Sequence, residues 1–250
     1  MSRILADLHI HTALSPCAER EMTPPAIVAE AVRRGIGVIA VCDHNSAGNA
    51  GAVARAARGL AVIPGMEITT AEEVHVVALF PDTAAAERAA REVTESLPLW
   101  KPLTSFGPGD SLRKPEQEIM DEHGAVTGIE ERMLASASRF TLSEAVDLIR
   151  DHGGLAIAAH VDRRAFSVVG QLGFFPEDVR FDALEISAAG AARGRAAQFA
   201  SHGLPLVSSS DSHFLSEIGA SATALDVEAP CFEEIRRALR GDGGRRCGIA

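Results

Sequence analysis

Short apolar runs alternate with amphipathic stretches along most of the chain, in strand–helix–strand order. The apolar runs predict strands over residues 3–10, 37–44, 60–68, 73–80, 155–160, 181–187, 204–211 and 222–227. The amphipathic stretches predict helices over residues 23–35, 46–59, 82–97, 141–154, 191–203 and 231–240. Nearly continuous apolar strands between such helices indicate a buried parallel sheet. About seven such units in 250 residues favour a closed or nearly closed (β/α) barrel over an open sheet.

Residues 98–140 interrupt this alternation. The segment contains prolines at positions 98, 102, 108 and 115, together with the one tryptophan of the chain. A long irregular segment inside a barrel is more often a lid or an insertion than a disordered linker. We therefore expect a single domain over residues 1–250, with an irregular lid or insertion at about 98–140.

The composition is that of an ordinary globular protein, with 46% hydrophobic and 23% charged residues. The sequence has no run of about 18 apolar residues, which a membrane-spanning helix needs. It enters a strand almost at once, without the basic and apolar regions of a signal peptide. Four cysteines show neither CxxC pairing nor disulfide-dense spacing. These features predict a reduced, cytoplasmic protein that makes no membrane contact.

The formal net charge is −10, with histidine counted as neutral. Such a balance argues against a broad basic face, so we expect no surface for duplex nucleic acid. A small phosphorylated substrate or a nucleotide is compatible with it, because bound metal ions would invert the local field.

The nine histidines fall into two groups. Three of them precede glycine, two at the ends of predicted helices, where a histidine suits the helix dipole and glycine caps the helix. These three, expected to be structural, are His123, His152 and His202. The other six lie in or at the ends of predicted strands, as do three acidic residues. These nine residues are His9, His11, His44, His75, His160, His213, Asp43, Glu67 and Asp211.

Side chains at the strand ends of a barrel meet in space, because the C-terminal ends of the strands converge on one face. His9 and His11, two residues apart in a predicted strand, should point to the same side of the sheet. Imidazoles and carboxylates crowded into one cleft would be left unsatisfied, whereas divalent cations satisfy them all. The pattern therefore predicts a polynuclear metal site.

At this point the motifs resemble those of a known family. The sequences "DLHIHT", "VCDHN", "IPGMEIT", "EVHVVALF", "IAAHVDR" and "SSSDSH" occur in this order, nearly from end to end of the chain. Together they resemble the PHP (polymerase and histidinol phosphatase) family of metal-dependent phosphoesterases. The resemblance implies a distorted (β/α)7 TIM-like barrel with two or three metal ions, commonly zinc, manganese or iron, at the C-terminal ends of the strands.

The resemblance also implies a ligand set. The first metal ion would take His9, His11, Glu67 and Asp211. Glu67 would bridge to a second ion that also takes His75 and His160, and a third ion would take His44 and His213. The family usually has a carboxylate five residues after the second histidine, where this chain has Pro16. Glu19 is the favoured substitute, with Glu21 and Cys17 as alternatives from the same loop, and a two-metal site is the remaining alternative.

Roles beyond metal binding follow from sequence position. Strand alternation turns Asp7 to the side of His9, so Asp7 is expected to orient an imidazole, whereas Asp43 would point away from His44. Arg163 and Arg164 follow His160 and are expected to clamp a phosphate. Glu185 should face the interior of the sheet.

The expected activity is hydrolysis of a small phosphomonoester, a nucleotide or an oligonucleotide end. Two cations about 3.5–4 Å apart would hold a phosphate oxygen and generate the attacking hydroxide from metal-bound water. Two alternatives remain open. One is a noncatalytic metal-binding module that regulates a partner. The other is a metal-dependent amide or lactone hydrolase, although such enzymes often use a carboxylated lysine on a strand and no predicted core strand here contains lysine.

Overall fold

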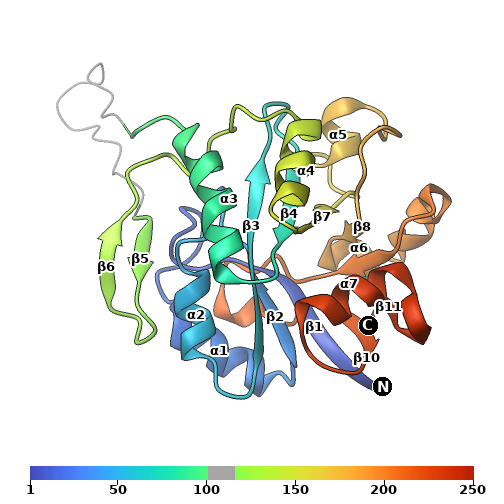
Figure 1. The fold of residues 1–250 in the computed structure, drawn as a ribbon, viewed down its shortest axis with the longest axis horizontal. Coiled ribbons are helices and arrows are strands. Elements are labelled where there is room, and N and C mark those ends of the chain that lie inside the picture. The colour runs from blue at the N-terminus through green and yellow to red at the C-terminus, as the bar shows by residue number, and fades with distance from the viewer. Residues whose placement is uncertain (101–115) are drawn as a thin grey trace.

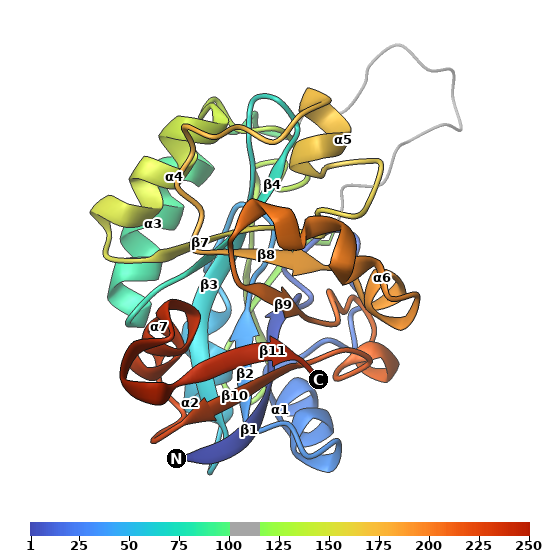
Figure 2. The same cartoon turned by 90° about the vertical axis from the view of Figure 1, so that its right-hand side faces the viewer.

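The structure, a computed structural model, describes residues 1–100 and 116–250. A mixed sheet forms its centre, in the strand order β11-β10-β1-β2-β3-β4-β7-β8-β9. The first and last strands of this order lie against each other, so the sheet is nearly closed (Figure 2). The expected barrel is thereby confirmed. The strands are β1 Ser2–Ile10, β2 Val38–Val41, β3 Ala61–Thr69, β4 His75–Leu79, β7 Leu155–Ala158, β8 Ala183–Ile186, β9 Leu206–Ser208, β10 Thr223–Val227 and β11 Arg246–Ile249.

Helices connect the strands; α2 and α3 lie against β3, and α4 lies against β4 and β7 (Figure 1). They begin where the sequence supplies caps: Pro24 starts α1, and Thr141 forms a capping box with Glu144 at α4. None of the helices in the described ranges has the length and hydropathy needed to cross a bilayer. The helices are α1 Pro24–Arg33, α2 Ala50–Ala56, α3 Thr83–Glu95, α4 Leu142–Asp151, α5 Val168–Leu172, α6 Ala188–Ala192 and α7 Phe232–Arg240, with 3-10 turns η1 Arg195–His202, η2 Leu215–Glu217 and η3 Asp242–Gly244.

Two hydrophobic layers pack on the sheet. The outer layer joins the strands to α1–α4 and includes Ile39 and Val41 of β2. The inner layer fills the barrel and includes Val38 and Ala40 of β2 together with residues of α7. Alternate residues of one strand thus serve opposite layers, as the two-residue period of a strand requires.

The expectation of a parallel sheet is wrong at two places. β10 is antiparallel to both β1 and β11, and the second place is β4. This strand is antiparallel to both β3 and β7. Its antiparallel direction follows from the short connection to β3, since parallel neighbours need a longer crossover. Thr69, the last residue of β3, therefore pairs with His75, the first residue of β4. His75 reaches the rim of the barrel from the start of its strand, not from its end.

A register shift in β1 sets the direction of its polar side chains. β1 advances from Asp7 to Ile10 while β2 advances only from Ile39 to Val41. The extra residue is a β-bulge, which interrupts the alternation of side chains. Asp7 consequently lies opposite Ile39 of the outer layer, whereas His9 faces into the barrel. The sequence pattern predicts that Asp7 and His9 share a face of the sheet, and the structure shows that they do not.

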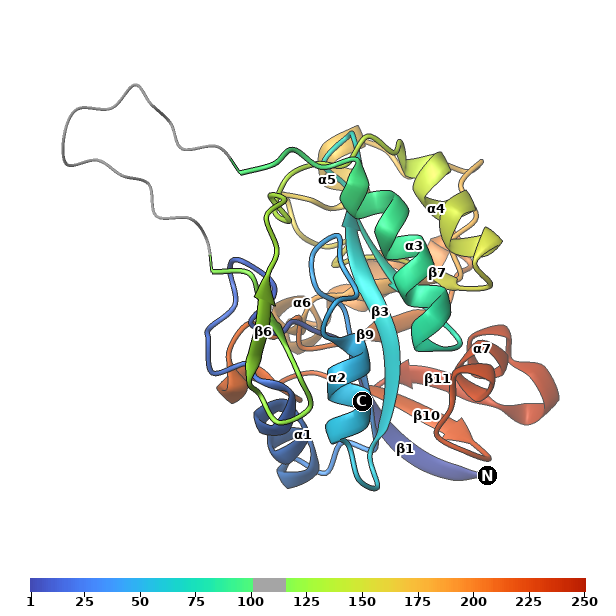
Figure 3. The same ribbon diagram turned by 60° about the vertical axis from the view of Figure 1, so that its left-hand side comes forward.

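The described part of the 98–140 segment contains a hairpin of β5 (Glu118–Met120) and β6 (Val126–Ile129). Figure 3 shows this hairpin standing outside the barrel, near α1 and α2. Asn49 fixes it, because its side-chain amide donates to the Glu118 carbonyl and accepts from the Met120 N–H. Residues 101–115 lie outside the described residues, so the lid or insertion stays a prediction.

Candidate metal centre

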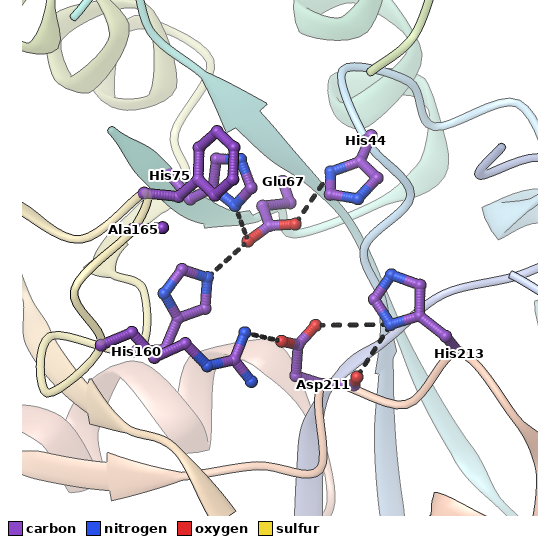
Figure 4. Close-up of a pocket in the computed structure, with 9 residues that line it drawn as sticks. His44, Glu67, His75, His160, Ala165, Asp211 and His213 are labelled. Atoms are coloured by element: carbon purple, nitrogen blue, oxygen red, sulfur yellow. Dashed lines mark hydrogen bonds and ion pairs between the residues drawn. The ribbon is translucent and has the colours of Figure 1, made fainter. Parts of the chain in front are cut away.

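Six histidines and two carboxylates converge at one rim of the barrel, and Figure 4 shows those of them that line the pocket. They come from the C-terminal parts of strands or the loops that follow them, except His75, which begins β4. His44 pairs across to Glu67, and the loop after β9 pairs with the end of β1 through Ile10 and Ser212. Residues far apart in sequence are thereby brought together. These eight residues are His9, His11, His44, Glu67, His75, His160, Asp211 and His213.

The first expected ligand set is assembled in full. The ligand atoms of His9, His11, Glu67 and Asp211 all lie within 4.8 Å of one another. His9 Nε2 is 3.2 Å from His11 Nε2 and 3.5 Å from Glu67 Oε1. His11 Nε2 is 3.2 Å from Asp211 Oδ1. The two histidines thus point to one side, as the sequence predicts, and the four donors surround one point.

Two further groups share members with the first. One contains His44, Glu67 and His75, and the other contains His11, His44 and His213. His160 Nε2 lies 3.2 Å from Glu67 Oε1, yet His160 falls outside all three groups. His44 thus joins Glu67 and His75 in one group, while both His75 and His160 contact Glu67 Oε1. The clusters are compatible with several metal ions.

The buried polar atoms fit cation binding. His44 Nδ1 and Glu67 Oε2 are 3.0 Å apart, but neither makes a hydrogen bond within the described part of the chain. His160 Nδ1 is likewise buried without a hydrogen-bond partner there. Such orphaned atoms are costly unless something binds them. Imidazole and carboxylate donors suit zinc, manganese or iron.

The electrostatic field of the cluster favours positive charge. Burial works against protonation of His9, but Glu185, Glu67 and Asp211 raise its pKa well above the usual value. Burial likewise opposes ionisation of Glu67, yet His75, His9 and His44 hold its pKa well below the usual range. The carboxylates stabilise positive charge at this point, whether protons or divalent cations supply it.

The loop after β1 places a thiol at the third group. Partial burial disfavours the thiolate of Cys17, but contacts with His213 and His44 lower its pKa to about 7. Glu19, the favoured substitute for a family carboxylate, is exposed, and its backbone N–H donates to the His213 carbonyl over 3.0 Å. Glu21 is also exposed. Cys17 is therefore the alternative whose side chain contacts the histidines.

Two carboxylates orient the imidazoles. Glu185 Oε2 lies 3.1 Å from His9 Nδ1, on the ring side opposite the cluster. Asp43 acts through Ser15: its carboxylate accepts a hydrogen bond of 2.6 Å from Ser15 Oγ, and Ser15 Oγ lies 2.9 Å from His11 Nδ1. The sequence missed the part played by Glu185, although alternation along β8 indicated that this residue faces inward.

Asp7, expected to orient an imidazole, has other partners. It accepts from the backbone N–H groups of Ser210, at 2.9 Å, and Gly219, at 2.8 Å. Burial raises the pKa of Asp7 to about 6. Because the bulge in β1 turns it to the outer layer, Asp7 anchors the residue that precedes Asp211.

A cavity of about 250 Å³ opens beside the cluster. Arg163 lines it, and Arg163 Nη1 pairs with Asp211 Oδ2 over 2.6 Å, while 43% of the Arg163 side chain is exposed. Arg164 is exposed and is not among the residues that line this cavity. The lining residues are His44, Glu67, His75, His160, Arg163, Ala165, Phe166, Asp211 and His213.

Backbone strain gathers at the same rim. Of the residues with a positive φ other than glycine in the described ranges, three line the cavity: His160 (φ 29°), Phe166 (φ 59°) and Asp211 (φ 52°). A fourth, Asn45, directly follows His44. Bulky residues in this region cost about 1–3 kcal/mol each and cluster at functional sites.

Comparisons with known proteins agree with this fold. A family model described as "PHP-associated" matches residues 190–242. The 5'-3' exoribonuclease Rnm of Salmonella typhimurium is 25% identical over 197 residues, which are 64% of this chain and 66% of the relative. The lesion-specific endonuclease PfuEndoQ from Pyrococcus furiosus superimposes with a TM-score of 0.70 at 20% identity, over 98% of this chain and 58% of that chain. The chain thus spans at most about two thirds of these relatives' length.

Fold and site define a TIM-like barrel whose rim can hold more than one divalent cation. The match to the PHP-associated model over residues 190–242 agrees with the resemblance to the PHP family, and the 25% identical relative is a 5'-3' exoribonuclease.

The expectation of no face for duplex nucleic acid is wrong. Endonuclease Q, in a complex with a 27-mer duplex substrate that has an abasic lesion at the active site, superimposes with a TM-score of 0.72 at 20% identity, over 98% of this chain and 58% of that chain. A barrel of this fold can therefore be part of a protein that binds a duplex. Net charge is a property of the whole surface, and it does not determine what a local site of bound cations attracts.

Proposed function

We propose that the chain is a metal-dependent phosphoesterase that hydrolyses a phosphate ester at the rim of the barrel. The group formed by His9, His11, Glu67 and Asp211, beside a cavity lined by Arg163, carries this proposal. Relatives named as a 5'-3' exoribonuclease and an endonuclease support chemistry on phosphate esters. Two or three divalent cations would supply Lewis acidity at a phosphate oxygen and a water of lowered pKa.

The residues of the chain have separate tasks in this reaction. Glu67 takes part in two of the clusters and would fix the separation of their ions. Glu185 holds His9, and Asp43 holds His11 through Ser15, so the imidazoles keep their direction. The Arg163 guanidinium would bind phosphate oxygens in addition to Asp211.

The substrate we propose is a nucleotide or the end of a nucleic acid, with a small phosphomonoester as the simplest member of the class. A cavity of about 250 Å³ is small for a whole ligand, since pockets for such molecules usually measure about 300–1,000 Å³. It suits a phosphate group and its sugar, and the rest of the substrate would extend from the mouth.

Metal analysis paired with turnover tests this function. Purified protein would be analysed for zinc, manganese and iron, and then offered phosphomonoesters, nucleotides, and single-stranded and duplex oligonucleotides. We expect two or three ions per chain, and phosphate-ester hydrolysis that a chelator abolishes and added metal restores. A protein that binds no metal after reconstitution, or that hydrolyses none of these esters when loaded, would contradict the proposal.

A matched pair of variants assigns the activity to this rim. Glu67→Gln removes a negative charge shared by two groups and should lower the metal content of the protein. It should also lower kcat by about 100-fold or more, as the loss of a charge-stabilising group does. Glu95→Gln makes the same chemical change at the exposed end of α3 and should alter neither.

A further inference from the structure

Phe166 lies at the mouth of the cavity in an unusual setting. Its ring stacks on the His75 ring, with centroids 4.5 Å apart and planes inclined by 19°. The His75 ring also contacts the cluster, because its Nδ1 is 2.8 Å from Glu67 Oε1. The Phe166 ring therefore packs directly on a residue of the proposed metal site. Phe166 is 42% exposed.

The loop that presents Phe166 is held at several points. The Phe166 carbonyl accepts 2.8 Å from the backbone N–H of His75. The Arg163 N–H donates to the His160 carbonyl, and Ser167 Oγ donates to the Arg163 carbonyl. The turn thus fixes Arg163 and Phe166 together on the wall of the cavity.

The conformation of Phe166 adds to the case. With φ at 59°, its backbone is in the left-handed region, where glycine is relaxed and a bulky side chain is strained. An aromatic ring held in this way, in a residue that is 42% exposed and lines the cavity, is a surface on which a flat ring can stack. Base–aromatic stacking tolerates any base, because every base has a π-face.

We propose that the exposed face of Phe166 is the platform for the base of a nucleotide whose phosphate lies in the cavity beside Arg163. The inference rests on the proposed function and narrows its substrate class: the chain would prefer nucleotides and nucleic-acid ends over phosphate esters that lack a base. Phe166 is then a specificity-determining residue, while the metal ligands act on the phosphate alone.

Two substrates that differ by the base alone test this platform. Adenosine 5′-monophosphate and ribose 5-phosphate offer the same phosphate on the same sugar. Phe166→Ala should raise KM for the nucleotide about tenfold or more with little change in kcat, and should leave the kinetics of ribose 5-phosphate unchanged. Phe166→Trp should restore the wild-type KM. Phe174→Ala removes a phenylalanine that is 62% exposed and outside the cavity lining, and should change nothing.

An equal loss of activity toward both substrates in Phe166→Ala would overturn the platform and assign Phe166 a structural role. An unchanged KM for the nucleotide would also overturn the platform. A second readout does not depend on turnover. Stacking of the base should quench the added fluorescence of the F166W variant when the nucleotide binds, but not when ribose 5-phosphate binds, with the wild type and its one tryptophan as background. Quenching without hydrolysis of either ester would sustain the platform and defeat the proposed function; hydrolysis without quenching would do the reverse.

Discussion

At the scale of single residues, the side chains that hydrogen-bond to the candidate metal ligands decide how well those ligands are preorganised. Glu185 binds His9 through Nδ1 and also accepts from the backbone N–H of His160 over 3.1 Å. One carboxylate therefore fixes both an imidazole and the turn that leads to Arg163. Groups of this kind typically contribute 10–100-fold to metal affinity.

We expect Glu185→Gln to weaken metal binding by about 10–100-fold, because the amide keeps a hydrogen-bond acceptor for His9 but loses the charge that raises its basicity. Competition with a chelator of known affinity measures the change. Glu177→Gln, at an exposed position, should bind metal as the wild type does. An unchanged affinity in the first variant would show that Glu185 only fills space.

Cys17 is one of the alternative metal ligands that the sequence leaves open, in the loop where Pro16 replaces the family's carboxylate. If its thiolate binds a cation together with His44 and His213, the cobalt-substituted protein should show a sulfur-to-metal charge-transfer band in the near ultraviolet. Cys17→Ser should abolish the band, and Cys231→Ser, at an exposed site before α7, should keep it. A band that persists in Cys17→Ser would exclude the thiolate as a ligand.

At the scale of elements, the β3–β4 pair carries the two residues nearest the centre of the site. Glu67 and His75 are joined by one short connection, and Gly65 pairs with Leu79 of β4. A Cβ at Gly65 would meet the Ala78 carbonyl oxygen at 2.5 Å and Cys42 Sγ at 3.0 Å.

Gly65→Ala should therefore force β3 and β4 apart. We expect the free energy of unfolding to fall by about 1–3 kcal/mol and Tm by roughly 2–12 °C for a chain of this size. Gly248→Ala in β11 is the control, since a Cβ there meets nothing within 4 Å. Thermal unfolding followed by circular dichroism compares the two variants, and equal Tm values would contradict the packing argument.

The apolar pattern predicts most strands and helices because period and caps are local properties. It misses the direction of β4, since the sequence of a strand is the same in a parallel or an antiparallel pair. It also predicts one helix over 191–203, whereas the chain forms α6 and η1, separated at Gly194 with φ of 67°. Among site residues, the metal-ligand candidates could be found from their motifs. The partners of Asp7 and Glu185 could not, because the bulge in β1 appears only when two strands pair.

At the scale of the whole molecule, the site joins β1, β3, β4 and the loops after β2 and β9. Cations that bind the folded chain and not the unfolded one should stabilise it by about 2.7 kcal/mol when metal is present at 100 times the dissociation constant. Tm should rise with added metal and fall with a chelator. In Glu67→Gln this dependence should be much weaker, because a donor shared by two groups is lost. A Tm that ignores metal in the wild type would contradict cation binding at this rim.

His11 meets Asp211, which lies 200 positions further along the chain. On the ribosome, the first histidines leave the exit tunnel long before Asp211 and His213 have been synthesised. A nascent chain can thus offer an incoming cation only part of a site until nearly the whole barrel has emerged. Binding of a cation by the complete site would therefore be a late event in synthesis, and it would report that the barrel has closed.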